Sequence, residues 1–388
     1  MPRGDSGRIV LEVDPKAKRR LYAALALSGR TMKDWFLDAA EDYCVVQEQP
    51  TLTLFPPTFQ VEPEHAAGDP LSGGSGKPRR KTTHKVVSLF SGCGGMDLGF
   101  TGGFTAFGRS YARHPFEIVW ANDLNEAACA TYRRNLGDEI RCGSVWDVMD
   151  SLPASADVVI GGFPCQDISV NGKRAGVDGA RSGLYKAMVE VVDRLRPKVF
   201  VAENVKGLLM QYNEKSLQQV IHDFRALGYA VSYHLYRAAD YGVPQNRERV
   251  FIVGTSPRTR SFVPPSPERN SVNWMTAEQA IADLERTPES PAINHIWSRA
   301  NKSPEQGSRR LKATRPAHTI RAECHGNIQF HYRLPRRISM REAARFQSFP
   351  DEFIFEAGLR EIERQVGNAV PPVLAWHVAK AVLGCLVG

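Results

Sequence analysis

The 388-residue sequence lacks three features that would assign it to a metal-binding, membrane or secreted class. Its seven cysteines include no Cys-x-x-Cys pair, which argues against a zinc site and against a disulfide framework. The chain contains no uninterrupted apolar run of membrane-spanning length, and it does not open with the segments of a signal peptide. These absences predict a protein of the reducing cytoplasm that binds neither a metal nor a membrane.

Basic residues outnumber acidic ones, and the formal net charge is +8. Basic surfaces attract polyanions because binding releases the counterions that surround phosphate groups. The charge is therefore compatible with a nucleic-acid partner, and also with a basic protein that has none. Hydrophobic residues make up 42% of the sequence, enough for a chain of this length to bury more than one core.

Residues 56–85 separate two parts of the chain. This stretch is rich in Pro, Gly and Ser and contains a basic run at 77–81. Such a composition cannot bury enough apolar area to order itself, so we interpret the stretch as a linker.

The part before the linker, residues 1–55, has the pattern of one strand and two helices. Residues 8–13 show the alternating pattern of side chains that is typical of a strand. Asp14 and Pro15 favour the start of a helix after it, and Thr31 begins a second helical pattern. This pattern resembles a ribbon-helix-helix module, in which two chains pair their strands and lay them in the DNA major groove. A homodimer follows from that interpretation, and a helical cap packed on the rest of the chain remains the alternative.

Beyond the linker, short apolar segments alternate with amphipathic helices. Strands are predicted at 86–90, 117–120, 157–160, 198–202 and 250–253, and helices at 126–136 and 184–195. Apolar strands between helices indicate an α/β fold with a doubly wound, mostly parallel sheet that is covered on both faces. Ligands of such sheets bind beyond the carboxyl ends of the strands.

The first two predicted strands end in residues suited to a nucleotide-like ligand. A glycine-rich turn over 90–95 follows the first strand, where glycine lets the backbone approach a ligand closely. The turn is not the G-x-G-x-x-G of dehydrogenases, and a tight strand-to-helix turn is the alternative. Asp123 ends the second strand, where a carboxylate could bind ribose hydroxyls or cap the next helix.

The next two strands end in groups suited to covalent chemistry. Cys165, between Pro164 and Gln166, follows the third strand, and Glu203 lies at the end of the fourth. If these strands are neighbours, a nucleophilic thiol and an acid/base carboxyl meet at one rim of the sheet. A packed cysteine and a solvated carboxylate are the simpler alternatives.

A basic segment precedes the last predicted strand. If it is extended, Gln245, Arg247 and Arg249 point to one face, where guanidinium groups could hold a base oxygen or a phosphate. A surface charge cluster is the alternative.

From about Lys85 to Val387, these segments resemble the cytosine-C5 DNA methyltransferase family in type and in order. The matching motifs are the turn 90–95, the loop 164–166, the segment 203–205, Gln245-x-Arg247-x-Arg249, and the segments 315–320, 341–345 and 367–372. The resemblance implies a Rossmann-like catalytic domain (86–255), a smaller target-recognition domain (256–337) and a C-terminal segment that returns to the catalytic domain (338–388). It also implies a restriction-modification role on double-stranded DNA; a repressor and a tRNA methyltransferase are the alternatives.

The resemblance assigns roles to matched positions, with S-adenosylmethionine as methyl donor and a cytosine swung out of the helix. Cys165 would add to C6, Glu203 would bind or protonate N3, and Arg249 would bind O2, with Arg247 supporting the loop. The cofactor would lie against Phe90, Ser91, Gly92, Gly94, Gly95, Asp123, Pro164, Asn368 and Val370. One departure concerns the adenine, because Ser144 stands where the family has an aspartate, and Asp147 could replace it.

Residues in two segments are expected to contact DNA. The polar, glycine-rich loop after Cys165 is typical of a segment that closes over a substrate, and the target-recognition segment mixes arginines with aromatic residues. In these segments the predicted contacts are Gln166, Asn171, Lys173, Arg174, Arg299, Arg309 and Arg310, and Gln245, which lies between the segments, is a further predicted contact.

Overall fold

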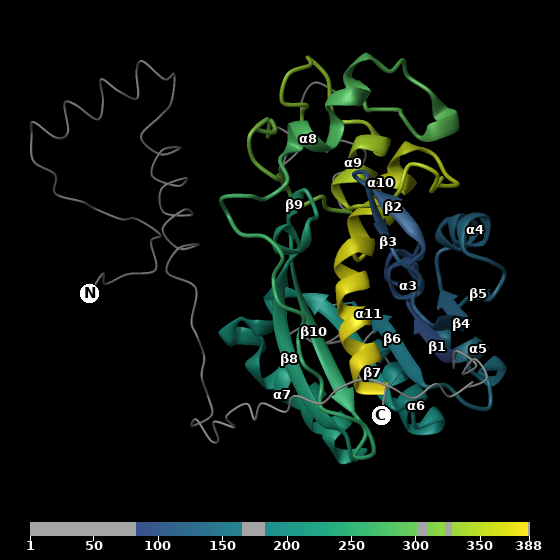
Figure 1. The fold of residues 1–388 in the computed structure, drawn as a ribbon. Coiled ribbons are helices and arrows are strands. Elements are labelled where there is room, and N and C mark those ends of the chain that lie inside the picture. The colour runs from purple at the N-terminus through teal and green to yellow at the C-terminus, as the bar shows by residue number, and fades with distance from the viewer. Residues whose placement is uncertain (1–82, 165–182, 301–308, 323–327, 387–388) are drawn as a thin grey trace, which may run out of the picture. The chain divides into compact units, whose positions relative to one another are not determined.

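A computed structural model describes residues 83–164, 183–300, 309–322 and 328–386 (Figure 1). The chain divides into two compact units, Met1–Lys77 and Pro78–Gly388. The predicted N-terminal module and most of the linker lie outside the described residues, as does the loop that begins at Cys165. The domain boundaries given above therefore stay predictions.

The described part of the second unit is built on a seven-stranded sheet. In sheet order the strands are β5 (Ile140–Cys142), β4 (Phe116–Asp123), β1 (His84–Leu89), β6 (Val158–Gly162), β7 (Val199–Val205), β10 (Glu248–Thr255) and β8 (Ala230–Arg237). Neighbouring strands are parallel except for β10, which is antiparallel to both β7 and β8. The predicted α/β class and mostly parallel sheet are confirmed.

Helices cover both faces of this sheet (Figure 1). The helices of the described residues are α3 (Gly95–Thr101), α4 (Glu126–Asn135), α5 (Val145–Val148), α6 (Leu184–Leu195), α7 (Glu214–Ala226), α8 (Ala277–Ile281), α9 (Met340–Phe346), α10 (Leu359–Asn368) and α11 (Pro372–Leu386). Of these, α8 and α9 lie above the sheet in the view of Figure 1. Two short pairs complete the set, β2 (Phe104–Ala106) with β3 (Arg109–Tyr111), and β9 (Gln245–Asn246) with β11 (Ala317–His318).

Alternation along the strands divides the apolar side chains between two cores. Val86 and Val158 belong to the core that contains α3 and α11, whereas Val87 and Val159 belong to the core that contains α6 and α7. Each fully buried valine contributes about 1.5–3 kcal/mol. The sequence did not predict β8, because this edge strand exposes apolar side chains such as Leu235.

The C-terminal helix α11 is mostly apolar and mostly buried, and its Lys380 is exposed. The stretch Leu359–Leu386 is long and apolar enough, by length and composition, to cross a membrane, which the sequence analysis did not anticipate. In the structure 67% of the 18-residue apolar part of this stretch is buried inside the protein, and α11 packs on α3. At their contact a Cβ on Gly99 would lie 2.4 Å from the Cβ of Ala375, so only glycine allows the helices to approach this closely.

Candidate active site

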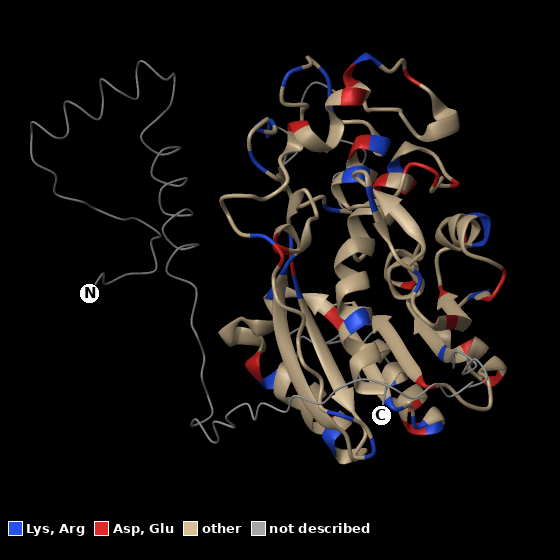
Figure 2. Cartoon of the chain, in the orientation of Figure 1, with Lys and Arg blue, Asp and Glu red and all other residues tan. Residues whose placement is uncertain are grey.

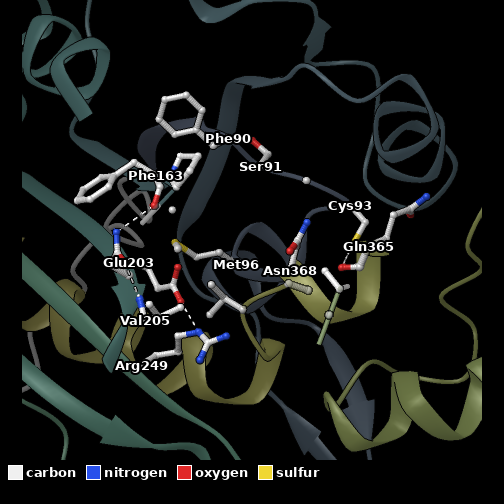
Figure 3. A pocket seen from close by; sticks show the side chains of 18 of the residues that line it. Phe90, Ser91, Cys93, Met96, Phe163, Glu203, Val205, Arg249, Gln365 and Asn368 are labelled. Carbon is white, nitrogen blue, oxygen red and sulfur yellow. Dashed lines mark hydrogen bonds and ion pairs between the residues drawn. The ribbon is translucent and has the colours of Figure 1, made fainter. Parts of the chain in front are cut away.

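A cavity of about 760 Å³ opens at the carboxyl ends of the central parallel strands. Its wall includes the residues that follow β1, β4, β6 and β7, which is where a sheet of this type binds ligands. The described wall also includes the segment 319–322, Asn246, Glu248 and Arg249, and residues of α3, α4 and α10. Figure 3 shows the side chains around it.

The turn after β1 and the end of β4 are joined by hydrogen bonds. Gly92, with φ of 57°, donates its N–H to Oδ2 of Asp123 at 2.8 Å. The other carboxylate oxygen, Oδ1, accepts the N–H of Asn125 at 2.9 Å. Burial raises the pKa of Asp123, and these two hydrogen bonds oppose the increase. Phe90 also has a positive φ, 55°, which is a strained conformation for this residue.

Asn125 caps α4, so the capping role considered for Asp123 is wrong. The Asn125 side chain accepts the N–H of Ala128 at 2.8 Å. The Asp123 carboxylate therefore remains in the cavity wall, together with Phe90, Ser91 and Gly92.

The last two glycines of the turn do not line the cavity, although the sequence placed them against the cofactor. A Cβ on Gly94 would lie 2.2 Å from Cδ1 of Leu136, and a Cβ on Gly95 would lie 2.5 Å from the carbonyl oxygen of Val370. Because these two glycines have no side chain, the turn can pack closely against Leu136 and against the backbone at Val370. Val370 and Asn368 do line the cavity.

Pro164 lies in the cavity wall, and Cys165 lies outside the described residues. The turn that leads to this cysteine is fixed from the neighbouring strand. Asn204 at the end of β7 donates its side-chain N–H to the carbonyl oxygen of Phe163 at 3.0 Å. The sequence analysis included Asn204 in the matching segment 203–205 but gave it no role, because its partner is a backbone group that follows another strand.

Glu203 and Arg249 form an ion pair in the cavity wall. The Nε of Arg249 lies 2.8 Å from Oε1 of Glu203, and both side chains are nearly buried (Figure 3). Burial raises the pKa of Glu203, while Arg249 and Arg247 oppose the increase. The site therefore offers a carboxyl whose acid form persists to higher pH than usual.

Arg247 is buried away from the cavity and ties its own segment to two others. Its guanidinium donates to the carbonyl oxygens of Ile320 at 3.1 Å, Gly367 at 2.9 Å and Ala369 at 3.0 Å. Burial lowers its pKa well below the ordinary arginine value. This position supports the cavity wall rather than a ligand.

Gln245 does not reach the surface, so the structure contradicts its predicted contact with DNA. Its side chain donates to Phe346 and Gln347 and accepts from the N–H of Ile320 at 2.9 Å. The N–H of Arg247 donates to the carbonyl oxygen of Gln245, which closes a tight turn. This turn interrupts the extended segment between β9 and β10, so its alternate side chains do not share one exposed face.

Of the other predicted DNA contacts, Gln166, Asn171, Lys173 and Arg174 lie outside the described residues. Arg309 is exposed. In the described part of residues 256–337, the predicted target-recognition domain, basic and acidic positions are interspersed (Figure 2).

Two arginines of that region already have protein partners. Arg299 is exposed, pairs with Glu289 and lies over the Trp297 ring at 5.1 Å. Arg310 donates to the carbonyl oxygens of His331 and Leu334.

The loop after β5 does not contribute its polar side chains to the cavity. Neither Ser144 nor Asp147 belongs to the described wall. Asn122 holds this loop by donating to the carbonyl oxygens of Arg141 and Gly143, each at 2.9 Å.

Asp97, which the sequence analysis did not single out, lies in the wall and is fully buried. Tyr132 donates its hydroxyl to Oδ1 of this carboxyl at 3.0 Å. Burial raises the pKa of Asp97 to about 6.

Comparison with known proteins identifies the family. The model for C-5 cytosine-specific DNA methylases matches residues 84–306 and 273–384. The chain is 38% identical over 350 residues to the Type II methyltransferase M.NgoFVII of Neisseria gonorrhoeae, over 81% of this chain and 88% of that protein. It is 32% identical over 339 residues to the Type II methyltransferase M.BbvI of Brevibacillus brevis, over 76% and 89% of the two chains.

A solved structure shares the fold. The crystal structure of the S. pombe Dnmt2 methyltransferase superimposes with a TM-score of 0.57 at 18% identity, over 77% of this chain and 98% of that one. Together with the family match and the strand-end cavity, these likenesses assign the chain. The protein belongs to the C-5 cytosine-specific DNA methylase family.

Proposed function

We propose that this cytosine-C5 DNA methyltransferase takes its methyl group from S-adenosylmethionine and acts on a cytosine extruded from a specific duplex sequence. The observation that carries the proposal is one cavity that holds both the Glu203–Arg249 pair and the Asp123 carboxylate. A base and a nucleoside cofactor can therefore meet in it. Protection of DNA in a restriction-modification system is the accompanying role, as the Type II names of the relatives suggest.

The cavity fits the cofactor by its donors and acceptors. The Gly92 turn leaves open space where a side chain would stand, and Asp123 presents a carboxylate to hydroxyl donors. When bound, S-adenosylmethionine supplies an electrophilic methyl group. Extrusion of the base costs a few kcal/mol and exposes its reactive edge.

The chain's own residues activate the base. The Cys165 thiolate forms a bond to C6 and makes C5 nucleophilic, while the acid form of Glu203 holds N3 and Arg249 holds O2. Transfer of the methyl group to C5 would leave S-adenosylhomocysteine. The C5 proton then passes to water, and the electron pair of that C–H bond restores the C5–C6 double bond as the C6–S bond breaks and returns the Cys165 thiolate. Covalent catalysis thus divides one difficult substitution into easier steps.

Transfer of a labelled methyl group distinguishes the substrates. We expect purified protein with labelled S-adenosylmethionine to modify duplex DNA and not tRNA, and bisulfite sequencing of that DNA to locate the methylated sequence. Transfer to tRNA alone would contradict the proposed substrate, and no transfer to either would contradict the activity.

Gly162, at the end of β6, is expected to be required for the position of Glu203. A Cβ at Gly162 would lie 2.9 Å from Oε2 of Glu203, whose other oxygen is held by Arg249. Gly162→Ala should therefore displace the carboxyl and lower kcat by roughly 10- to 100-fold, since small misplacements of reacting groups are costly. Steady-state methyl transfer measures the effect.

Gly384→Ala is the matched control, because a Cβ there meets nothing within 4 Å. Its kcat should equal that of the wild type. A Gly162→Ala protein with unchanged kcat would contradict the positioning role.

We also propose that residues 1–55 dimerise the protein through the ribbon-helix-helix pattern. In that pattern Leu11 belongs to the face opposite Arg8, Val10 and Glu12, which would face DNA. Leu11→Asp should convert a dimer to a monomer in sedimentation of the full chain and leave methyl transfer intact. A wild-type monomer would contradict the proposal.

A further inference from the structure

The cavity wall contains a buried amide with no partner. Gln365 on α10 is 5% exposed and lines the cavity. Within the described part of the chain, neither its Nε2 nor its Oε1 has a hydrogen-bond partner. An unpaired buried polar group costs about 1–3 kcal/mol, so an amide with both atoms unpaired indicates a ligand that donates and accepts.

The backbone of Gln365 is fixed, although its side chain is free. Its carbonyl oxygen accepts from the Cys93 thiol and from the N–H of Ala369. One helical turn earlier, Glu361 accepts from the Asn125 side chain at 2.7 Å. Asn125 in turn donates its N–H to the Asp123 carboxylate. The wall that carries Gln365 is therefore tied to the Asp123 end of the cavity.

This end lies away from the base-activating pair. Figure 3 shows Gln365 beside Cys93, across the cavity from Glu203 and Arg249, with Met96 between them. In the proposed mechanism the cytosine meets Glu203 and Arg249, and the wall that carries Gln365 is tied to Asp123, a carboxylate suited to ribose hydroxyls. This end therefore suits the nucleoside of the cofactor. Ser144 and Asp147, the residues considered for the adenine, are not in the wall, so the nucleoside must obtain hydrogen bonds elsewhere.

We propose that Gln365 binds the adenosine part of the cofactor through its side-chain amide. The amide offers one acceptor and two donors, which match a ribose hydroxyl or the donor–acceptor edge of adenine. Asp123, an acceptor that already receives two backbone N–H groups, complements it. This inference rests on S-adenosylmethionine as the cofactor.

Calorimetric titration of Gln365→Met with two ligands tests the inference. S-adenosylhomocysteine contains the complete nucleoside and the amino acid, whereas 5′-methylthioadenosine lacks the amino acid. Because the lost hydrogen bonds go to adenosine, both ligands should bind roughly tenfold more weakly to the variant. Arg360→Met, an exposed change on the same helix, should bind both as the wild type does.

Thermal unfolding separates a binding role from a structural one. Methionine removes an unpaired amide, so the ligand-free variant should melt at the wild-type temperature or above it. A lower melting temperature, unchanged affinities, or weakening of S-adenosylhomocysteine alone would each overturn the inference. A wild-type protein that does not bind S-adenosylhomocysteine would instead contradict the proposed cofactor, so the two failures are distinguishable.

Discussion

Cys165→Ala is expected to abolish methyl transfer while leaving the binding of S-adenosylhomocysteine measurable. Alanine cannot form the bond to C6, and without that bond C5 of cytosine is a poor nucleophile. Loss of an enzyme's nucleophile typically costs about 10⁴-fold or more in kcat. Transfer of labelled methyl groups to DNA measures the loss, and calorimetry measures the retained affinity.

A trapping experiment tests the same residue independently of rate. Duplex DNA with 5-fluorocytosine at the target should form a covalent complex with the wild type, because fluorine cannot leave C5 as a proton does. Cys165→Ala should form none, whereas Cys385→Ala, a change in a buried thiol on α11, should still form it. Methylation that persists in the Cys165 variant would refute the mechanism.

Glu203→Gln is expected to lower kcat by about 10²- to 10⁴-fold, the range for a positioned acid/base group. The pH dependence gives the sharper result. Burial raises the pKa of Glu203, so its acid form is retained below that pKa and lost as the pH rises through it. Only the acid form of Glu203 can donate a hydrogen bond to N3 of the cytosine. The wild-type kcat should therefore decline as the pH rises through the pKa of Glu203, and the kcat of the glutamine variant should not show this decline.

Single-turnover rates across the neutral and alkaline range measure this difference. Glu356→Gln, which removes a charge from an exposed pair with Arg134, should keep the wild-type pH profile. If the Glu203→Gln profile retained the alkaline decline, another group would be its source, and the assigned role of Glu203 would be wrong.

The strand ends show how far sequence reasoning reaches. Asp123 and Glu203 were predicted to lie in a site because parallel strands deliver their carboxyl ends to one edge, and the cavity lies there. Gln245 was misplaced because a tight turn breaks the assumed alternation. The proposed role of Gln365 could not be predicted from the sequence, because it rests on the absence of hydrogen-bond partners for a buried amide in the described structure. Hydrogen-bond partners between distant segments are set by packing, which periodicity does not describe.

The pairing of α3 with α11 has a consequence for synthesis. Gly99 and Ala375 lie in contact, yet about 276 residues separate them along the chain. At ribosomal rates of roughly 5–20 residues per second, α11 emerges about 14–55 s after α3. Throughout that interval the apolar face of α3 has no native cover and the wall from α10 does not exist. The enzyme therefore becomes competent only after α11 has been synthesised, so a copy whose chain stops before α11 has no complete cavity in which to modify DNA.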